Sequence, residues 1–424
     1  GFVEIHGGKS ERERRESWER VRRSSRTVVV GVRSAVLAPV RDLAGLVVVD
    51  EHRSEFKEER RPRFHARDVA VARGRLAGCP VFIADATPSA ETWLSLSKGE
   101  YRRFDRQGLP PVRVNALTVD MRRHRGELLS PMLLRELRKV TEQSRSAVLY
   151  LNRRGISRSV VCRDCGSALA CPECGLPLLL TRSRTLDCRW CGKTDSAPDR
   201  CPVCSGSCFE FRSPGTDALA DALRRVLPGS RVVEVVVGDR LEFAPGTLLV
   251  GTRALLSLSW PEDLALVAAV DADVDLMLPD FRARERTFQT LRGFLERAGF
   301  FSARAVIQTR RPDDPAIAAA LSGDVAEFMN AELRRRDELG FPPFRRLVLL
   351  ELRKATAAAA ENLARRLRRN RAVEVLGPVP EPRDRFRILV KLPNELPPGR
   401  VVSPDSIEMR GVELRVDVDP LDVV

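Results

Sequence analysis

The chain has 424 residues, of which 43% are hydrophobic and 31% charged, and 72 Lys and Arg against 58 Asp and Glu give it a net charge of +14. This length exceeds what one compact core needs and predicts two to four domains, while the balance of apolar and charged residues excludes an intrinsically disordered protein. The basic excess favours polyanionic partners, because phosphate contacts release counterions, although an arginine-rich proteome would give the same charge.

The sequence carries no feature of a membrane or secreted protein. It contains no run of eighteen or more uncharged apolar residues, so we expect no spanning helix and no membrane partner. Residues 1–6 are neither a methionine-led start nor a charged region followed by an apolar stretch, and we expect no signal peptide. They have the character of the middle of a domain, so we expect further residues upstream of Gly1. We therefore expect a cytoplasmic protein.

The first block of the chain, residues 1–120, alternates amphipathic helices with apolar strands rich in β-branched residues. We expect these strands at residues 27–31, 45–50 and 80–84. Continuous apolar runs separated by helices are typical of strands that are buried on both faces of a parallel sheet. The block is therefore expected to be part of an α/β domain.

The strand expected at 45–50 ends in two carboxylates, Asp50 and Glu51, followed by His52. In two-lobed ATPases an Asp at this place orients magnesium, and the Glu after it positions the attacking water. Acidic residues also commonly end the strands of parallel sheets, so the motif alone leaves both interpretations open. The segment Asp85-Ala86-Thr87-Pro88-Ser89, after the next strand, supports the ATPase interpretation.

The loop that follows the acidic motif, residues 56–68, interleaves aromatic and basic side chains. Aromatic rings stack on bases while neighbouring cations bind phosphates, which is a pattern of single-stranded nucleic-acid binding. We therefore name Phe56 and Phe64 as candidate DNA contacts.

The second block, residues 121–330, repeats the alternation of strands and helices, and a cysteine-rich stretch at 162–208 interrupts it. Its strands are expected at residues 147–151, 247–251 and 266–271. Arg153 and Arg154 lie between the first of these strands and the cysteines. Contact with a DNA backbone is one interpretation of this pair, and an exposed basic turn is the other.

Nine of the ten cysteines lie between residues 162 and 208, and eight of them form four Cys-x-x-Cys pairs. The pairs are Cys162/Cys165, Cys171/Cys174, Cys188/Cys191 and Cys201/Cys204. A two-residue gap lets both thiolates of a pair reach one tetrahedral ion at about 2.3 Å, and two pairs complete a closed site. We therefore predict two structural zinc ions rather than disulfides, which are rare in a reducing cytoplasm. The spacing leaves the pairing open; first with fourth and second with third is one nested solution.

The last block, residues 340–424, begins at the rigid apolar turn Gly340–Phe344 and holds strands around a helix expected at 355–369. No long low-complexity linker separates the three blocks, and no internal repeat of about 20–50 residues is present. Three folded blocks with one inserted module are therefore expected.

These features together resemble one family, the PriA (primosomal protein N′) helicases that restart collapsed bacterial replication forks. The resemblance covers essentially all 424 residues, and the combination of Leu151-Asn152-Arg153-Arg154-Gly155 with the eight cysteines is its most specific part. The other motifs that carry it are His6-Gly7-Gly8, Gly31–Ala35, Asp50-Glu51-His52, Ala86–Ser89, Gly215-Thr216-Asp217, Gly251-Thr252-Arg253, Leu278–Ala283, Glu285–Phe288, Gly340–Phe344, Leu376-Gly377-Pro378 and Val416–Pro420.

The resemblance implies an α/β fold of two RecA-like helicase lobes, the first one incomplete, with an inserted two-zinc module and a small C-terminal α/β domain. The implied domains are the lobes at 1–120 and 121–330, the zinc module at 160–210 and a DNA-binding domain at 335–424. The implied zinc ligands are Cys162, Cys165, Cys201 and Cys204 on one ion, and Cys171, Cys174, Cys188 and Cys191 on the other. The implied partners are forked DNA, single-stranded DNA and the other primosome and replisome-loading proteins at the bacterial nucleoid.

The ATPase motifs depart from the family pattern in the first block. The G-x-x-x-x-G-K-[ST] phosphate loop is not in this chain, and its expected place lies before the first residue. The family's Asp-Glu-Glu-His becomes Asp50-Glu51-His52, and Asp85 replaces the serine before Ala-Thr-Pro. Binding of ATP and Mg²⁺ therefore stays open.

The second block departs further. The family's Ala-Lys-Gly-His-Asp-Phe becomes Leu256–Trp260, with Ser257 in place of the lysine. The family's Gln-x-x-Gly-Arg-Ala-Gly-Arg keeps its first arginine as Arg297 but has Phe300 in place of the second. An arginine finger is worth about 10³–10⁵ in rate, so we expect ATP-driven unwinding to be weak or absent.

Three interpretations follow. The first is a fork-binding, zinc-containing primosome protein that serves as a loading platform without efficient helicase activity. The second is a working ATP-dependent 3′-to-5′ helicase, in which Asp50 and Glu51 hold magnesium and water and Arg297 senses the nucleotide. The third is a zinc-ribbon nucleic-acid protein, or the product of a decaying gene. We prefer the first.

Overall fold

The computed structural model describes most of the chain, in two compact units. One unit is Gly1–Tyr101 with Asp417–Leu421, and the other is Arg102–Val416 with Asp422–Val424. Among the residues that the structure describes, no helix is long and apolar enough to cross a membrane. The residues outside the description are 25, 105–113, 125, 153–159, 163, 166, 168, 174–177, 181–184, 189–191, 197, 208, 211–214, 236–242, 279, 382–383, 403–410, 422 and 424.

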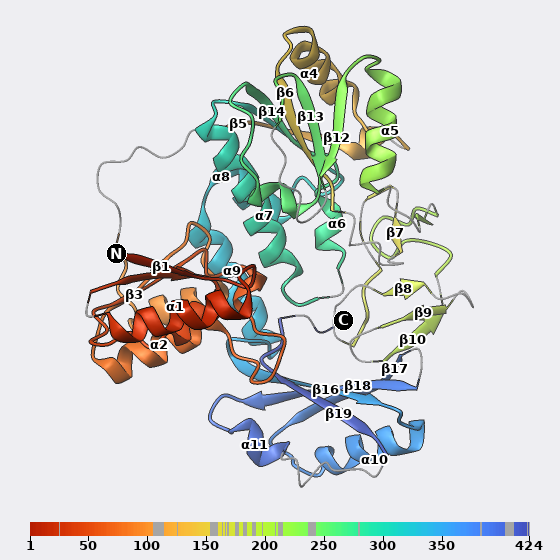
Figure 1. The fold of residues 1–424 in the computed structure, drawn as a ribbon. Helices are drawn as coiled ribbons and strands as arrows, with labels where there is room; N and C mark the ends of the chain where they lie inside the picture. Colours follow the sequence, from red (N-terminus) through yellow and green to blue (C-terminus); the bar gives the residue numbers. More distant parts are fainter. Residues whose placement is uncertain are drawn as a thin grey trace. The chain divides into compact units, whose positions relative to one another are not determined.

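The first unit contains two parallel pairs of short strands, each with a helix packed against it (Figure 1). Val21 of α1 packs with Val3 and Ile5 of β1, and Ala70 of α2 packs with Val48 of β3. The elements are β1 (Phe2–Ile5), α1 (Glu11–Arg23), β2 (Val28–Gly31), η1 (Arg33–Leu37), β3 (Leu46–Val49), η2 (Ser54–Phe56), α2 (Ala66–Ala77), β4 (Val81–Ala84) and α3 (Ala90–Ser97). Each strand pair runs in parallel, β1 beside β2 and β3 beside β4, as the apolar runs predict. The predicted burial of these strands on both faces is wrong in this unit, because Val28, Val47 and Phe82 are 63%, 67% and 52% exposed.

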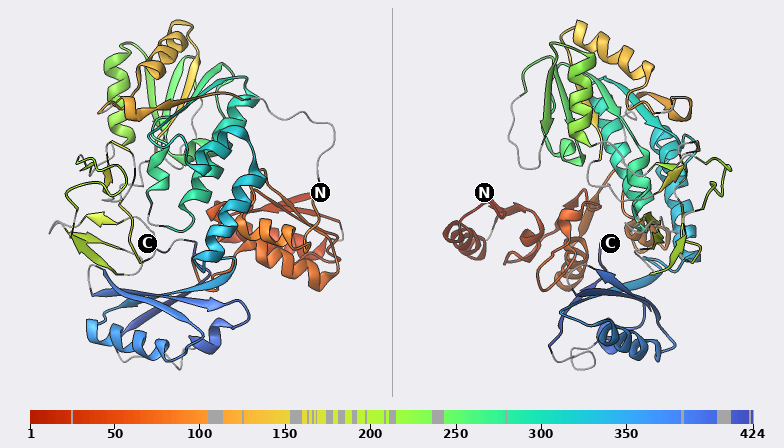
Figure 2. Two further views of the ribbon diagram at one scale, coloured as in Figure 1. Left: turned by 180° about the vertical axis from the view of Figure 1, so that it is seen from behind. Right: turned by 90° about the vertical axis from the view of Figure 1, so that its right-hand side faces the viewer.

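The second unit is built on a six-stranded parallel sheet in the order β12-β13-β6-β14-β15-β5. Helices α4 and α5 cover one face and α7 covers the other (Figures 1 and 2). The elements are β5 (Asn115–Asp120), η3 (Met121–Arg123), α4 (Pro131–Glu142), β6 (Ser146–Tyr150), α5 (Thr216–Val226), β12 (Arg231–Val235), β13 (Thr247–Gly251), η4 (Arg253–Ser257), β14 (Leu264–Ala269), α6 (Asp273–Leu276), α7 (Ala283–Phe300), β15 (Arg304–Thr309), α8 (Pro315–Ser322) and α9 (Val325–Glu338).

Strand β6 shows why these apolar runs form central strands. All five of its residues are buried, because alternate side chains point to opposite faces and both faces are covered. Ala147 and Leu149 belong to the core shared with α4 and α5, whereas the Tyr150 ring stacks on Phe294 of α7 at 4.6 Å. The α/β fold class expected from the sequence is confirmed.

The cysteine-rich module follows β6 and consists of very short antiparallel strands. They are β7 (Val161–Cys162), β8 (Leu179–Leu180), β9 (Thr185–Asp187), β10 (Thr194–Ser196) and β11 (Phe209–Glu210). β7 pairs with β11, and β8, β9 and β10 form a separate sheet. So small a module shares its core with its neighbours: Leu169, Leu178 and Leu186 pack with Leu347 and Leu389 of the C-terminal sheet.

The C-terminal sheet is antiparallel, in the order β17-β18-β16-β19, and α10 packs on one face of it (Figure 1). Along β16, Leu347 and Leu349 face the module core, and the residues between them point to the opposite face. The elements are β16 (Arg345–Arg353), α10 (Ala357–Arg368), β17 (Glu374–Glu381), β18 (Arg385–Pro393), α11 (Pro398–Val401) and β19 (Glu413–Val418). The sheet thus has a helix on one side and the cysteine-rich module on the other.

Candidate functional site

Four cysteines of the module meet at one point in the second unit. The sulfur atoms of Cys162, Cys165, Cys201 and Cys204 all lie within 4.8 Å of one another. Cys162 Sγ is 3.5 Å from Cys204 Sγ, and Cys165 Sγ is 3.7 Å from Cys201 Sγ. These separations far exceed the about 2.05 Å of a disulfide and match the about 3.8 Å between two sulfurs of a tetrahedron with 2.3 Å zinc–sulfur bonds. The donor set and its geometry therefore fit one tetrahedral metal ion.

Backbone hydrogen bonds shape both ends of this cluster. The Cys201 N–H donates to Gly206 O at 2.7 Å, and the Ser205 N–H donates to Cys201 O at 2.8 Å, which closes the turn between the second pair. A Cβ added at Gly206 would lie 2.1 Å from Asp164 Oδ2, so a larger residue there would displace the Asp164 side chain. Burial raises the pKa of the Cys162 thiol to about 12, so a metal ion must displace its proton on binding.

The other predicted ligand set is described only in part. Cys171 and Cys188 are both buried and belong to the core that the module shares with the C-terminal sheet. Cys174 and Cys191 lie outside the described residues, as do the predicted DNA contacts Arg153 and Arg154. The second zinc site stays a prediction.

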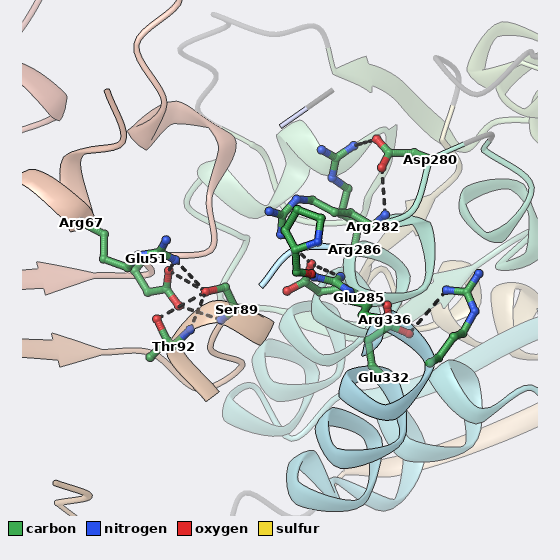
Figure 3. A network of polar contacts seen from close by, with 12 residues as sticks. Glu51, Arg67, Ser89, Thr92, Asp280, Arg282, Glu285, Arg286, Glu332 and Arg336 are labelled. Carbon is green, nitrogen blue, oxygen red and sulfur yellow. Dashed lines mark hydrogen bonds and ion pairs between the residues drawn. The ribbon is translucent and has the colours of Figure 1, made fainter. Parts of the chain in front are cut away.

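The acidic motif lies at the end of β3 in the first unit, and there Glu51 is completely buried. Its Oε1 accepts the Ser89 N–H at 2.7 Å, and its Oε2 accepts from Ser89 Oγ at 3.1 Å and Arg67 Nη1 at 2.9 Å (Figure 3). Ser89 is also the N-cap of α3, so the carboxylate ties β3, α2 and α3 together. Both oxygens of Glu51 are thus used by the fold.

Asp50 is the more accessible carboxylate of the pair. Its side chain is 45% exposed and forms an ion pair with Arg53 Nε at 3.1 Å. Its φ of 51° places it in the left-handed region, which only a few non-glycine residues adopt.

His52 pairs with Asp85, the residue that replaces the family's serine. His52 Nδ1 lies 2.7 Å from Asp85 Oδ2, and Asp85 Oδ1 accepts the Thr87 N–H at 2.8 Å. Burial of the ring lowers the pKa of His52, but the hydrogen bond to Asp85 and the negative charges of Asp85, Glu51 and Asp50 outweigh it and leave the pKa raised. His52 therefore holds its proton more tightly in the folded protein than an unperturbed histidine does.

We expect Asp85→Asn to lower the pKa of His52 towards its ordinary value. A raised folded pKa stabilises the fold below the unfolded value of about 6.5, and this contribution is lost as pH rises through the folded pKa. The variant should therefore lose more stability at about pH 5.5 than at about pH 8.5. Histidine-selective NMR titration would give the pKa, since the chain has only four histidines. Equal losses at both pH values would contradict the assignment.

The two predicted DNA-stacking rings lie against the core of the first unit. Phe56 and Phe64 are partly buried and pack on the cluster that contains Val48 and Ala70. Phe56 is also stacked on His65, with ring centroids 6.4 Å apart. Base stacking by these rings stays a prediction.

Arg297, the retained arginine of the second unit, is turned towards its own domain. Its guanidinium donates to Leu256 O at 2.9 Å and to Leu258 O at 2.6 Å. It also lies over the Trp260 ring, 4.2 Å from the centroid, and Trp260 Nε1 donates to Leu255 O at 2.8 Å. Arg297 and Trp260 therefore clamp the loop in which the family's lysine would lie. Sequence reasoning did not predict these contacts, although it noted that Trp260 ends the segment that differs from the family pattern.

A second buried network, which sequence reasoning also missed, lies around Arg336 of α9. This fully buried arginine bonds Glu285 of α7 at 2.7 Å, Glu332 at 2.9 Å and Pro342 O at 3.2 Å (Figure 3). Next to it the ring of Phe281 stacks on Phe341 at 5.2 Å. Arg336 therefore joins two helices of the second unit to the apolar turn before the C-terminal sheet.

Comparison with known proteins gives a consistent set of relatives. The family model of the primosomal protein N C-terminal domain matches residues 337–421. The replication restart protein PriA of Treponema pallidum (strain Nichols) is 34% identical over 99% of this chain, which spans 68% of that protein. The replication restart protein PriA of Bacillus subtilis (strain 168) is 31% identical over 98% of this chain, which spans only 56% of that protein. The likeness thus extends over nearly the whole chain.

Proposed function

Because the chain belongs to the PriA family of replication restart proteins, we propose that it binds abandoned replication forks and zinc and hydrolyses ATP weakly or not at all. Its role would be that of a loading platform in the bacterial cytoplasm, which holds forked or single-stranded DNA and receives the other primosome proteins. Zinc is the metal proposed for the four-thiol cluster, and a second zinc for the other four cysteines.

One observation supports the loss of ATPase activity: two of the three candidate catalytic residues, Glu51 and Arg297, are already used by the fold. A Glu that activates water needs an accessible carboxylate, but Glu51 is buried and accepts three hydrogen bonds. An arginine finger needs a free guanidinium, but Arg297 donates to loop carbonyls and lies over Trp260.

An active 3′-to-5′ helicase is the second candidate. The accessibility of Asp50 favours it, because this carboxylate remains available for magnesium. Steady-state ATP hydrolysis by the purified protein, with and without forked DNA, separates the two candidates. We expect no fork-stimulated turnover in a sample that is shown to bind both zinc and fork DNA. Clear stimulation by the fork would favour the helicase.

We expect the double variant Ser257→Lys/Phe300→Arg to gain fork-stimulated ATP hydrolysis. Ser257 is exposed and Phe300 is 80% exposed, so longer side chains at both positions fit without disturbing the core. They would restore the two cations that the family places near the phosphates. The matched control is Ser259→Lys, an exposed serine of the same loop, which should leave turnover unchanged. If the double variant is as inactive as the control, the activity was not lost through these two positions.

A further inference from the structure

Lys57 is a buried lysine in the loop between β3 and α2. Its ammonium group has three donors, and all three find backbone carbonyls: Val418 O at 2.7 Å, Asp419 O at 2.9 Å and Arg63 O at 3.4 Å. Asp417 Oδ1 lies 3.4 Å away and balances its charge. Only 7% of the residue is exposed. A charged group so deeply buried is tolerated only when it is fully paired, so these contacts are needed.

The loop around Lys57 is itself held in one conformation. Lys57 forms an antiparallel bridge with His65, and the Glu58 N–H donates to Phe64 O at 2.8 Å. From the other side, Arg33 Nη1 donates to Lys57 O at 2.9 Å. Lys57 therefore projects from a small ordered hairpin, residues 57–65, rather than from a free loop.

Two of the carbonyls that accept from Lys57, those of Val418 and Asp419, lie 361 and 362 positions away in sequence. They belong to the segment Asp417–Leu421, which is part of the same compact unit. Arg63 makes a second contact with it, 3.7 Å from Asp417 Oδ2. Two cations of the hairpin thus meet one carboxylate and two carbonyls of the C-terminal segment. Neither cation is then available as a freely exposed phosphate ligand.

We propose that the segment Asp417–Leu421 is a latch on the hairpin 57–65, with Lys57 as the residue that closes it. The latch fixes the hairpin, which follows the acidic motif Asp50-Glu51 directly in the chain. It makes the segment Asp417–Leu421 an integral part of the first unit. Lys57 and Arg63 belong to this latch and not to a surface for nucleic acid.

Hydrogen exchange measured by mass spectrometry tests the latch on the whole protein. In Lys57→Met the carbonyls of the segment lose their donor, so exchange should accelerate in peptides covering 57–65 and in those covering 417–421. We expect a factor of about ten or more, the ratio that corresponds to about 1.4 kcal/mol. The matched control is Lys98→Met, the same change at an exposed lysine of the first unit, which should leave both segments unchanged. Acceleration in only one segment, or in neither, would overturn the latch.

A second variant tests the latch in case Lys57→Met disturbs the whole fold. If Lys57→Met exchanges faster throughout the chain, Asp417→Asn decides, because it keeps the shape and removes the charge. If Asp417→Asn does not accelerate exchange in the hairpin 57–65, the latch is wrong.

The salt dependence of single-stranded DNA binding separates the latch from a phosphate contact. Loss of a phosphate contact would reduce the salt slope by about one, whereas we expect Lys57→Met to leave it unchanged. A reduced slope would overturn the proposal.

Discussion

Replacement of Cys201 by serine is expected to abolish metal binding at the four-thiol cluster and to unfold the module around it. Cys201 is buried, and its sulfur lies 3.7 Å from that of Cys165. The module has only very short strands and little core of its own, so metal binding must contribute much of its stability. Structural zinc sites supply on the order of 10–16 kcal/mol of apparent binding energy.

Metal analysis of reduced protein checks this directly. We expect two zinc ions per chain in the unaltered protein and at most one in Cys201→Ser, because the second predicted site lies in the same module. The control is Cys79→Ser, because Cys79 follows α2 in the first unit, far outside the cysteine-rich stretch in sequence. Fewer than about two zinc ions in the unaltered protein would contradict the two-site prediction. An unchanged zinc content in Cys201→Ser would contradict the ligand assignment.

Unfolding of the module should also destabilise the C-terminal sheet. Leu169, Leu178 and Leu186 share a core with Leu347 and Leu389 of the C-terminal sheet. Loss of the metal would remove apolar cover from that face of the sheet, and each fully exposed leucine costs about 1.5–3 kcal/mol. We therefore regard the metal as a support for the C-terminal domain as well as for the module.

The strands and the metal cluster were the predictable part of this molecule, because both depend on signals local in sequence. The apolar run at 147–151 became β6, and the run at 247–251 became β13. The spacing of the cysteines predicted closed sites, but which pairs meet was left open by spacing and was implied only by the family resemblance. The structure brings Cys162 and Cys165 together with Cys201 and Cys204.

The contacts that decide the use of each charged side chain could not be predicted in this way. The basic residues of the loop 56–68, which include Lys57, were expected to bind phosphate, and Arg297 was expected to sense the nucleotide. Their actual partners are carbonyls that tertiary folding brings near, at Val418 for Lys57 and at Leu256 for Arg297. No periodicity or motif encodes a hydrogen bond between residues 361 positions apart. The same is true of Arg336, whose sequence neighbourhood looks like an ordinary charged helix.

Arg336→Met is expected to destabilise the second unit by about 3–5 kcal/mol, because the variant breaks two buried ion pairs by removing their shared cation. Arg336 is fully buried, and the side chains of its partners Glu285 and Glu332 are only 3% and 2% exposed. Methionine fills a similar volume but cannot donate to either carboxylate or to Pro342 O. The loss also affects the packing of Phe281, whose ring lies 5.2 Å from the guanidinium carbon.

Urea denaturation followed by Trp260 fluorescence would measure this effect in variants that lack the other tryptophans. Arg334→Met is the matched control, since Arg334 is exposed on the same helix α9 and should cost less than about 0.5 kcal/mol. A second change separates charge from packing: Glu285→Gln in the Arg336→Met background removes a carboxylate that has lost its Arg336 partner and should recover part of the stability. If it recovers none, Arg336 stabilises the unit by its shape and not by its charge. If Arg336→Met costs no more than the control, the network does not join α7, α9 and the apolar turn.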